Sequence, residues 1–234
     1  MKKLSIVIPV FNEKNTIKEI IRRVENSRLE NIEKEIIIVD DYSLDGTREI
    51  LQGFSARHKI IFQNKNMGKG AALRSGFGAV TGDIIIVQDA DLEYDPSDYG
   101  ILVEPIISGQ ADVVYGSRLT GSKAHRVLFF WHYLGNKFLT SLSNIMTNLN
   151  LTDMETCYKA LTRDALNQIL PRLTSNRFGI EPEMTAYFAK CNFRIFEVGI
   201  SYFGRNYNQG KKINWRDGLA AIWHIIKFNL FSGF

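Results

Sequence analysis

Short apolar runs recur along the first half of the chain, and a more polar stretch separates each run from the next. They cover residues 4–10, 35–39, 59–62, 84–87 and 111–115, and several are rich in β-branched Ile and Val. Continuous apolar runs of this length are typical of strands that are buried on both faces of a sheet. The pattern therefore predicts five strands in a mostly parallel sheet.

Helical spacing of apolar residues fills the stretches between these runs. Ile17, Ile21 and Val24 share one face of a helix that Asn15 or Thr16 would cap. Strands that alternate with helices predict βαβ units and an α/β fold. The predicted helices include residues 16–26, 70–78, 99–107 and 126–150, and a later strand is predicted over 193–198.

Polar residues follow three of the predicted strands at the point where each strand ends. The first strand leads into Asn12-Glu13, the second into Asp40-Asp41, and the fourth into the segment 89–95 with its acids Asp89, Asp91 and Glu93. Parallel strands place these ends at one edge of the sheet, where open α/β sheets bind ligands. We expect the three clusters to meet in one site.

So many acidic side chains in one crevice would repel one another unless a cation lay among them. Hard oxygen ligands favour Mg²⁺ or Mn²⁺, and Mg²⁺ is usually held by one or two carboxylates together with substrate phosphates. Lys69 lies between two glycines before a helix and could add a counter-charge, and the helix N-terminus favours anions. The site is thus expected to take a phosphate-bearing ligand and a divalent cation.

Length, composition and charge limit the class of protein and the compartment that we expect. The chain has 234 residues, 45% hydrophobic and 23% charged, with a net charge of +4, which is enough for one large domain and gives no sign of a nucleic-acid partner. No run reaches the roughly 20 apolar residues that a membrane-spanning helix needs. Cys157 and Cys191 lack metal-ligand spacing and are expected to be reduced thiols. We expect a cytoplasmic protein that touches a membrane peripherally.

Four motifs follow one another along the chain: Ile-Pro-Val-Phe-Asn-Glu at 8–13, Asp-Asp-x-Ser-x-Asp-Gly-Thr at 40–47, Asn-x-Gly-Lys-Gly at 66–70 and Asp-Ala-Asp-Leu at 89–92. Together they resemble the family 2 glycosyltransferases, and most of all the polyprenyl-phosphate (dolichol-phosphate) mannosyl- and glucosyltransferases. Gly116-Ser117-Arg118 and Arg205 add further matches. The resemblance is strong over about the first 120 residues.

The resemblance implies a single GT-A domain, a Rossmann-like sheet flanked by helices. Residues 1–120 would bind the nucleotide sugar, and residues 121–234 would bind the acceptor through amphipathic helices. It further implies an inverting transfer of a hexose, mannose or glucose, from a GDP- or UDP-sugar to a polyprenyl phosphate at the inner face of the membrane. Phe11 stands where relatives often have Tyr, and Tyr42 where they often have Gly.

Site residues follow from the same resemblance, position by position. Asp89, Asp91 and Glu93 would hold the metal, and Asp91, Arg118 and Asp153 are the catalytic candidates. Lys212 is preferred over Lys211 in the loop after Arg205 only because an apolar residue follows it. The expected donor-binding residues are Pro9, Phe11, Glu13, Val39, Asp41, Lys69, Asp89, Ala90, Arg118, Arg205 and Lys212.

The acceptor side is less determined. If the acceptor is a sugar hydroxyl, a base must take its proton, and Asp153 is the first candidate and Glu155 the second. A lipid phosphate is already ionised near neutral pH and needs no strong base, and Lys159 could contact it. Residues 126–150 form a basic, aromatic and amphipathic pattern, which fits a helix in a membrane interface, a helix packed on the sheet, or contact with a second subunit in a homo-oligomer.

Three other functions remain open at this stage. The first is a glycosyltransferase that acts on a saccharide hydroxyl in surface-polysaccharide synthesis. The second is a sugar-phosphate nucleotidylyltransferase, which would want a Gly-rich basic loop where this chain has Phe11-Asn12-Glu13. The third is a non-catalytic nucleotide-sugar-binding or membrane scaffold protein. The sequence leaves the sugar, the base and the lipid undetermined.

Overall fold

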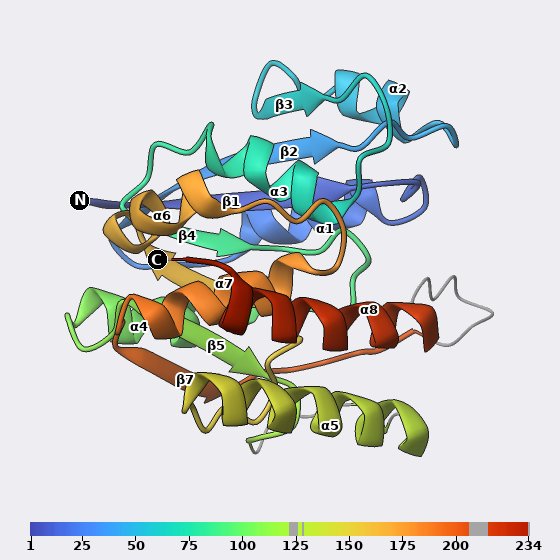
Figure 1. Cartoon of the computed structure of the whole chain (residues 1–234). Coiled ribbons are helices and arrows are strands. Elements are labelled where there is room, and N and C mark those ends of the chain that lie inside the picture. The colour runs from blue at the N-terminus through green and yellow to red at the C-terminus, as the bar shows by residue number, and fades with distance from the viewer. Residues whose placement is uncertain (122–125, 128, 206–214, 234) are drawn as a thin grey trace.

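The computed structural model describes residues 1–121, 126–127, 129–205 and 215–233, and within them the chain forms one mixed sheet with helices on both faces (Figure 1). Its strand order is β3-β2-β1-β4-β6-β5-β7. The strands are β1 Lys2–Val10, β2 Ile32–Asp40, β3 Lys59–Phe62, β4 Ile84–Val87, β5 Val113–Ser117, β6 Lys159–Thr162 and β7 Ile195–Gly199. The helices are α1 Ile17–Asn26, α2 Thr47–Gln52, α3 Lys69–Phe77, α4 Tyr99–Ile107, α5 Phe130–Thr147, α6 Arg163–Ile169, α7 Ile180–Lys190 and α8 Trp215–Ile226.

The predicted parallel sheet is confirmed for the first four strands. β1 lies between β2 and β4 and pairs parallel with both, and helices cover both faces of the sheet, so Ile6, Val7 and Ile8 have no exposed surface. β6 runs antiparallel to its neighbours β4 and β5, and β7 pairs parallel with β5. β6 was not predicted, because its four residues, Lys-Ala-Leu-Thr, carry neither an apolar run nor a clear alternation.

Several predicted boundaries agree with the structure, including residues 59–62, 84–87 and 99–107. The predicted helix 126–150 is shorter, since α5 ends at Thr147 and Asn148 takes a left-handed φ of 57°. Thr16 stands at the start of α1, but its side chain makes no cap. The hydroxyl instead donates to Glu13 Oε2 at 2.6 Å, so it supports a residue of the site.

α5 turns polar side chains toward the body of the protein. Thr140 and Ser143 are buried, and Thr140 Oγ1 accepts the backbone N–H of Met154 at 3.1 Å. Asn144 contacts both backbone polar groups of Leu151, at 2.7 and 3.2 Å. The helix is thus held by hydrogen bonds to the segment that follows it, which leaves part of its apolar side uncovered.

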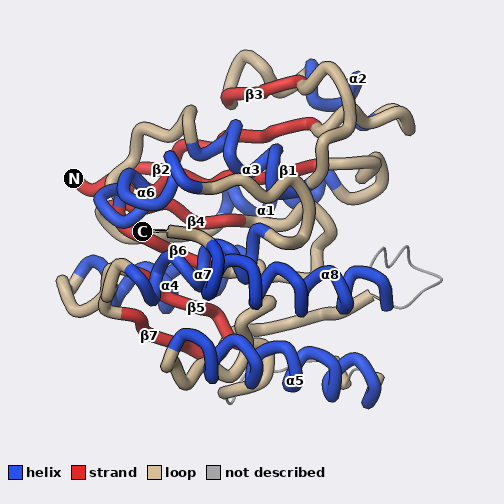
Figure 2. The backbone as a smooth tube through the Cα atoms, in the orientation of Figure 1, coloured by secondary structure: helices blue, strands red, loops and turns tan. Residues whose placement is uncertain are grey.

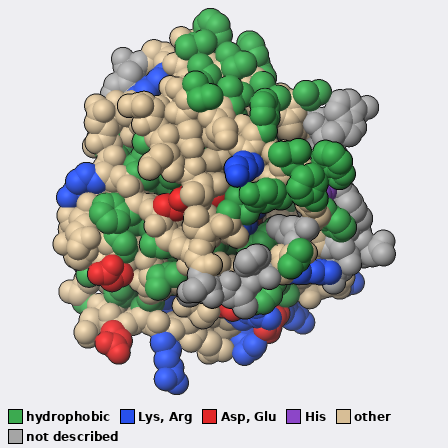
Figure 3. Space-filling view, turned by 90° about the horizontal axis from the view of Figure 1, so that it is seen from below, with side chains coloured by type: hydrophobic (Ala, Val, Ile, Leu, Met, Phe, Trp, Pro, Cys, Tyr) green, Lys and Arg blue, Asp and Glu red, His purple; other side chains and the backbone are tan. Residues whose placement is uncertain are grey.

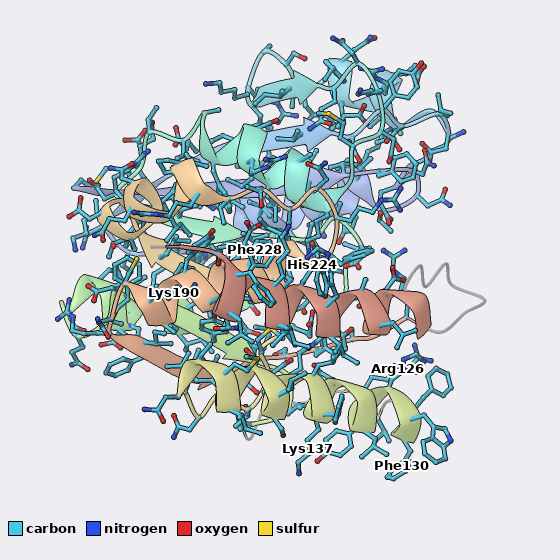
Figure 4. All side chains as sticks on the ribbon, in the orientation of Figure 1. Arg126, Phe130, Lys137, Lys190, His224 and Phe228 are labelled. Carbon is cyan, nitrogen blue, oxygen red and sulfur yellow. The ribbon has the colours of Figure 1, made fainter. Side chains whose placement is uncertain are left out.

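Large apolar side chains of α5 lie on the surface. Phe130 is 64% exposed, Trp131 77% and Phe138 57%. Figure 3 views the molecule from the α5 side and shows hydrophobic side chains gathered in patches on that face, and in Figure 4 Phe130 and Lys137 lie along the helix, away from the sheet. Such a face is larger than a scatter of single apolar residues, and faces of that kind mark contact with a protein or a membrane.

Candidate active site

The loops after β1, β2 and β4 gather at the carboxyl edge of the sheet, as predicted (Figure 2). The backbone N–H of Asn12 donates to Ser43 Oγ at 2.9 Å, and that of Glu13 donates to Thr47 Oγ1 at 3.0 Å. The β1 and β2 loops therefore hold each other. This contact fixes Glu13, which is buried, at the edge where the acids of β4 emerge.

Arg205 joins the ends of β1 and β4 from the second half of the chain. Its Nη2 lies 3.2 Å from both carboxylate oxygens of Glu13 and 3.5 Å from Asp91 Oδ2. Its backbone N–H donates to Glu93 Oε1 at 2.7 Å, and Tyr202 Oη donates to Glu93 Oε2 at 2.5 Å. Glu13, Asp91 and Arg205 thus lie together as predicted, while both oxygens of Glu93 already bind other groups.

Lys69 sits between two acids. Its Nζ lies 2.8 Å from Asp89 Oδ1 and 3.2 Å from Glu181 Oε1 on α7. Burial acts to lower the pKa of Lys69, but the nearby Asp89, Cys157 and Glu181 groups outweigh it and hold that pKa well above the usual value. Lys69 therefore remains a cation beside Asp89.

Arg118 and Asp153 form an ion pair beside Tyr202, in which Asp153 is fully buried and the Arg118 side chain is 16% exposed. Arg118 Nε donates to Asp153 Oδ2 at 2.6 Å and Nη2 donates to Oδ1 at 2.7 Å, while Asn136 Nδ2 on α5 adds a bond to Oδ1 at 2.9 Å. Burial alone would raise the pKa of Asp153, yet the charge and hydrogen bonds of Arg118 keep that pKa below its usual value. The Arg118 guanidinium also lies 5.2 Å from the centre of the Tyr202 ring.

Asp41 organises the loop that leads into α3. Its carboxylate accepts the backbone N–H groups of Met67 at 2.8 Å and Gly68 at 2.7 Å. Burial raises the pKa of Asp41, although the two amides act against that shift. Ala71 N, in the first turn of α3, donates to Asn176 O at 3.1 Å, so the N-terminus of this helix is less available to an anion than the sequence suggested.

Gly68 shows how closely the segment 175–177 covers this loop. Gly68 has a φ of +95°, and a Cβ atom there would lie 2.5 Å from Asn176 O. Only glycine meets both conditions, because other residues rarely adopt this conformation and would clash with the carbonyl. The loop 66–70 is therefore clamped between Asp41 and the chain before α7.

The remaining predicted donor residues differ in how a ligand could reach them. Pro9 and Val39 lie opposite each other on β1 and β2, and Val39 packs against Gly76 of α3 with no exposed surface. Ala90 is buried between the two aspartates, whereas Phe11 is 36% exposed at the mouth of the site. Lys212 lies outside the described residues.

Lys159 corrects one expectation from the sequence. Its side chain is fully buried under the site, and its Nζ donates to Met154 O, to Thr156 O and, at 2.8 Å, to Glu181 Oε2. It cannot reach out to a phosphate group from there. The sequence analysis did not identify its partner Glu181. A lysine buried in a sheet needs a buried acid as its counter-charge, so Lys159 in a strand could have prompted a search for such an acid.

Glu155 lies between these charged pairs. Its Oε1 atom is buried and accepts no hydrogen bond among the described residues. Burial, reinforced by the negative charge of Glu181, raises the pKa of Glu155 to about 7, although Lys159 and Arg118 oppose the shift. Glu155 therefore changes its charge near neutral pH.

The donor set at the end of β4 fits a hard divalent cation. The carboxylates of Asp89 and Asp91 are partly exposed. In this structure Asp89 pairs with Lys69, and Asp91 pairs with Arg205. Within the described part of the chain, no group of three or more His, Cys, Asp or Glu side chains could hold a metal alone. Two carboxylates completed by substrate phosphates are the usual arrangement for Mg²⁺. Glu93 does not join this pair in the present conformation.

Comparison with known sequences gives a family match over most of the chain. The model for "Glycosyl transferase family 2" matches residues 5–170. A dolichol-phosphate mannosyltransferase of Pyrococcus furiosus is 36% identical over 131 residues, which cover 55% of this chain but only 37% of that longer relative. A UDP-N-acetylglucosamine–dolichyl-phosphate N-acetylglucosaminyltransferase of Methanococcus voltae is 24% identical over 247 residues, covering 98% of this chain and 97% of the relative.

Solved structures confirm the GT-A fold. Glucosyl-3-phosphoglycerate synthase from Mycobacterium tuberculosis, in complex with Mn²⁺, UDP and glucosyl-3-phosphoglycerate, superposes with a TM-score of 0.74. The alignment covers 97% of this chain and 78% of that chain at 18% sequence identity. At this identity the similarity establishes the fold and leaves the acceptor open.

Proposed function

This chain belongs to glycosyl transferase family 2, and from that premise we propose that it transfers a hexose from a nucleoside diphosphate sugar to a polyprenyl phosphate. The donor would be a GDP- or UDP-hexose carrying mannose or glucose, and the transfer would invert the anomeric carbon. The similarity to a dolichol-phosphate mannosyltransferase and to a dolichyl-phosphate N-acetylglucosaminyltransferase supports a lipid phosphate as the acceptor class.

Asp89, Asp91, Lys69 and Arg205 would bind the diphosphate of the donor. The two carboxylates fit Mg²⁺ or Mn²⁺ as described above, and such a cation, when bound, supplies charge neutralisation for the departing nucleoside diphosphate. Arg205 lies against Asp91 and Glu13, so its guanidinium would be beside a diphosphate bound at Asp91. Lys69 would keep Asp89 oriented by the contact of 2.8 Å between their side chains.

The single observation that carries the choice of a phosphate acceptor is the state of Asp153. Both of its oxygens accept hydrogen bonds from Arg118, it has no exposed surface, and its pKa is depressed. A carboxylate in this state is a poor proton acceptor. A phosphate oxygen needs no base, since it can attack the anomeric carbon in its ionised form while the bond from that carbon to the nucleoside diphosphate breaks.

Arg118 would then act by position and charge. Asn136 holds Asp153, and Asp153 holds Arg118, whose side chain is 16% exposed and can attract the incoming phosphate group. Asp153 is a positioning residue in this account, and Arg118 is the group that meets substrate.

A peripheral contact with the membrane would deliver the lipid acceptor. The exposed aromatic side chains of α5, together with Lys137, fit a bilayer interface with anionic headgroups. In the portion of the chain that the structure covers, no helix has both the length and the hydropathy to cross a bilayer. We therefore propose that α5 rests on the membrane, at its inner face.

A hydroxyl acceptor is the second candidate function, and Glu155 is the observation that favours it. A pKa raised to about 7 suits a general base at neutral pH, so this candidate depends on Glu155 and not on Asp153.

The test of the acceptor is transfer of radiolabelled hexose from GDP- and UDP-sugars to polyprenyl phosphate or to soluble saccharides, with Mn²⁺ present. Label in the lipid fraction supports the proposal, and label confined to the saccharides would refute it.

A further inference from the structure

Glu197 binds the backbone of the segment that carries Asp153. The residue lies on β7, the strand at one edge of the sheet. Its Oε1 atom accepts the backbone N–H of Thr152 at 2.9 Å and that of Asp153 at 3.3 Å. One carboxylate therefore orients two consecutive peptide groups, and the second of them belongs to the ion-pair partner of Arg118.

Two hydroxyl groups extend this contact to the turn that contains Arg118. Thr152 Oγ1 donates to Glu197 Oε2 at 2.9 Å and lies 2.7 Å from Ser117 Oγ. Because an ionised carboxylate can only accept hydrogen bonds, the hydroxyl hydrogen of Thr152 points to Glu197, and Ser117 is the donor in the second contact. Ser117 Oγ in turn accepts the backbone N–H groups two and three residues further along the chain, at 3.1 and 3.2 Å.

Arg118 is thus supported on two sides, and both supports lead to the same carboxylate. The turn after Ser117 sets its backbone, while Asp153 accepts its backbone N–H at 3.0 Å and two hydrogen bonds from its guanidinium. Glu197 reaches the first support through Thr152 Oγ1 and the second through the backbone N–H of Asp153. A change at Glu197 would therefore disturb both supports together.

We propose that Glu197 is a positioning residue for the acceptor, because it sets the place of the Arg118 guanidinium without touching substrate itself. This inference rests on the proposed function, in which Arg118 meets the phosphate group of the acceptor. The Arg118 side chain is only 16% exposed, so a ligand reaches a small part of it and depends on its direction.

Glu35 offers a matched control at the other end of the sheet. It lies on β2 and also collects two consecutive backbone N–H groups and a threonine hydroxyl. Its Oε1 accepts the N–H of Thr81 at 2.5 Å and that of Gly82 at 3.0 Å, and its Oε2 accepts Thr81 Oγ1 at 2.6 Å. These contacts hold the turn before β4, at the amino edge of the sheet, whereas the site lies at the carboxyl edge. Glu35 thus makes the same kind of contact as Glu197 without supporting Arg118.

The test separates the acceptor from the donor. Transfer of labelled hexose to polyprenyl phosphate gives the KM of the acceptor for the wild type, Glu197→Gln and Glu35→Gln, and calorimetry with Mn²⁺ gives the affinity for GDP or UDP. An amide keeps the size of the side chain but accepts through only one oxygen, and a displaced positioning group costs up to about 100-fold. We expect Glu197→Gln to raise the acceptor KM about tenfold and to change the nucleotide affinity less than about twofold. Glu35→Gln should lower the melting temperature to a similar degree and leave the acceptor KM within about twofold of the wild type.

A double-variant cycle shows whether Glu197 acts through Arg118. Arg118→Ala should raise the acceptor KM by itself, and Glu197→Gln should add less than about twofold in that background, because the effects of coupled residues are not additive. Fully additive effects would overturn the inference. An acceptor KM that Arg118→Ala leaves unchanged would contradict the role of Arg118 in the proposed function, and the inference with it.

Thr152→Val keeps the test decisive if Glu197→Gln does not fold. It removes the hydroxyl that joins Glu197 to Ser117 and should raise the acceptor KM about threefold, as for one lost hydrogen bond, whereas the control Thr81→Val should not. An acceptor KM that neither Glu197→Gln nor Thr152→Val raises, or that Glu35→Gln raises equally, would overturn the inference. A wild type that transfers hexose but shows either result loses only the role of Glu197, whereas a wild type that transfers none to polyprenyl phosphate loses the proposed function and this inference with it.

Discussion

Asp153 and Arg118 meet through two parallel hydrogen bonds, Nε to Oδ2 at 2.6 Å and Nη2 to Oδ1 at 2.7 Å, with no surface of Asp153 exposed to solvent. The two residues come from the chain after β5 and the chain before β6, and the antiparallel pairing of these strands brings them together. Because Arg118 donates to both oxygens of Asp153, this carboxylate is a poor base. In the proposed function it instead holds Arg118 in place for the acceptor.

Asp153→Asn tests that role. The amide keeps the shape but loses the charge and one acceptor, so we expect the free energy of unfolding to fall by about 3 kcal/mol, as for a broken buried ion pair. Transfer to polyprenyl phosphate should fall about tenfold through a less ordered Arg118, and not by the several orders of magnitude expected for loss of a base. Urea unfolding and kcat/KM measure the two effects.

The control for this variant is Asp112→Asn. Asp112 and Arg194 form the same two-point contact on the surface, with Nη2 to Oδ1 at 2.7 Å. A surface pair contributes less than about 1 kcal/mol, so both stability and transfer should remain near the wild type. Equal effects of the two substitutions would mean that Asp153 has no special position in the site.

Glu155→Gln is expected to change the pH dependence of stability. The pKa of Glu155 is raised from 4.5 to about 7 in the folded protein, so the folded state binds the proton more tightly than the unfolded state does. The wild type should therefore lose stability relative to Glu155→Gln as pH rises from about 4.5 through 7, by a total on the order of 3 kcal/mol, and the difference should be constant above about pH 8. Urea unfolding from pH 5 to 8 measures it, and parallel curves for the two proteins would contradict the assignment.

Asp91→Ala should abolish most cation-dependent transfer. We expect a loss of about 100-fold, since the loss of a metal ligand removes several kcal/mol of charge stabilisation in the transition state. Electron paramagnetic resonance of Mn²⁺ with GDP or UDP should show weaker binding of the cation. Asp95→Ala is the control, because Asp95 caps the turn after β4 through Ser97 N at 2.9 Å and lies in the same loop. Unchanged Mn²⁺ binding in Asp91→Ala would remove Asp91 from the metal site.

Phe130→Ser combined with Trp131→Ser should release the protein from membranes. Both side chains lie mostly in solvent, so the melting temperature should stay within a few degrees while sedimentation with anionic vesicles decreases severalfold. Leu44→Ser is the control, because Leu44 is as exposed as Trp131 but lies after β2, on another part of the molecule. A loss of self-association without a change in vesicle binding would indicate instead that α5 forms a subunit contact.

The sequence predicted the fold of the first half of the molecule well for a physical reason. In parallel βαβ units, a strand that ends in polar residues must deliver them to a common edge, so local patterns were enough to predict that Glu13 and Asp91 lie together. The same logic located Lys69 beside Asp89, as the contact of 2.8 Å shows.

The second half of the chain could not be predicted from local patterns in this way. β6 is short and runs antiparallel to β4. It carries Lys159 into the core, where the lysine side chain pairs with Glu181. The occupation of Asp153 by Arg118 likewise depends on a contact between residues 35 positions apart. No local sequence pattern predicts which side chains will be paired with one another through such long-range contacts.

The most direct test of the account compares two acceptors of equal chain length, a polyprenyl phosphate and the corresponding polyprenol, with labelled hexose donors in the same vesicles. Because Arg118 offers a partly exposed cation for a phosphate and holds Asp153 in an ion pair, the account predicts labelled product from the polyprenyl phosphate and none from the polyprenol. Transfer to the polyprenol at a comparable rate would contradict it, since that reaction requires a base to remove the hydroxyl proton.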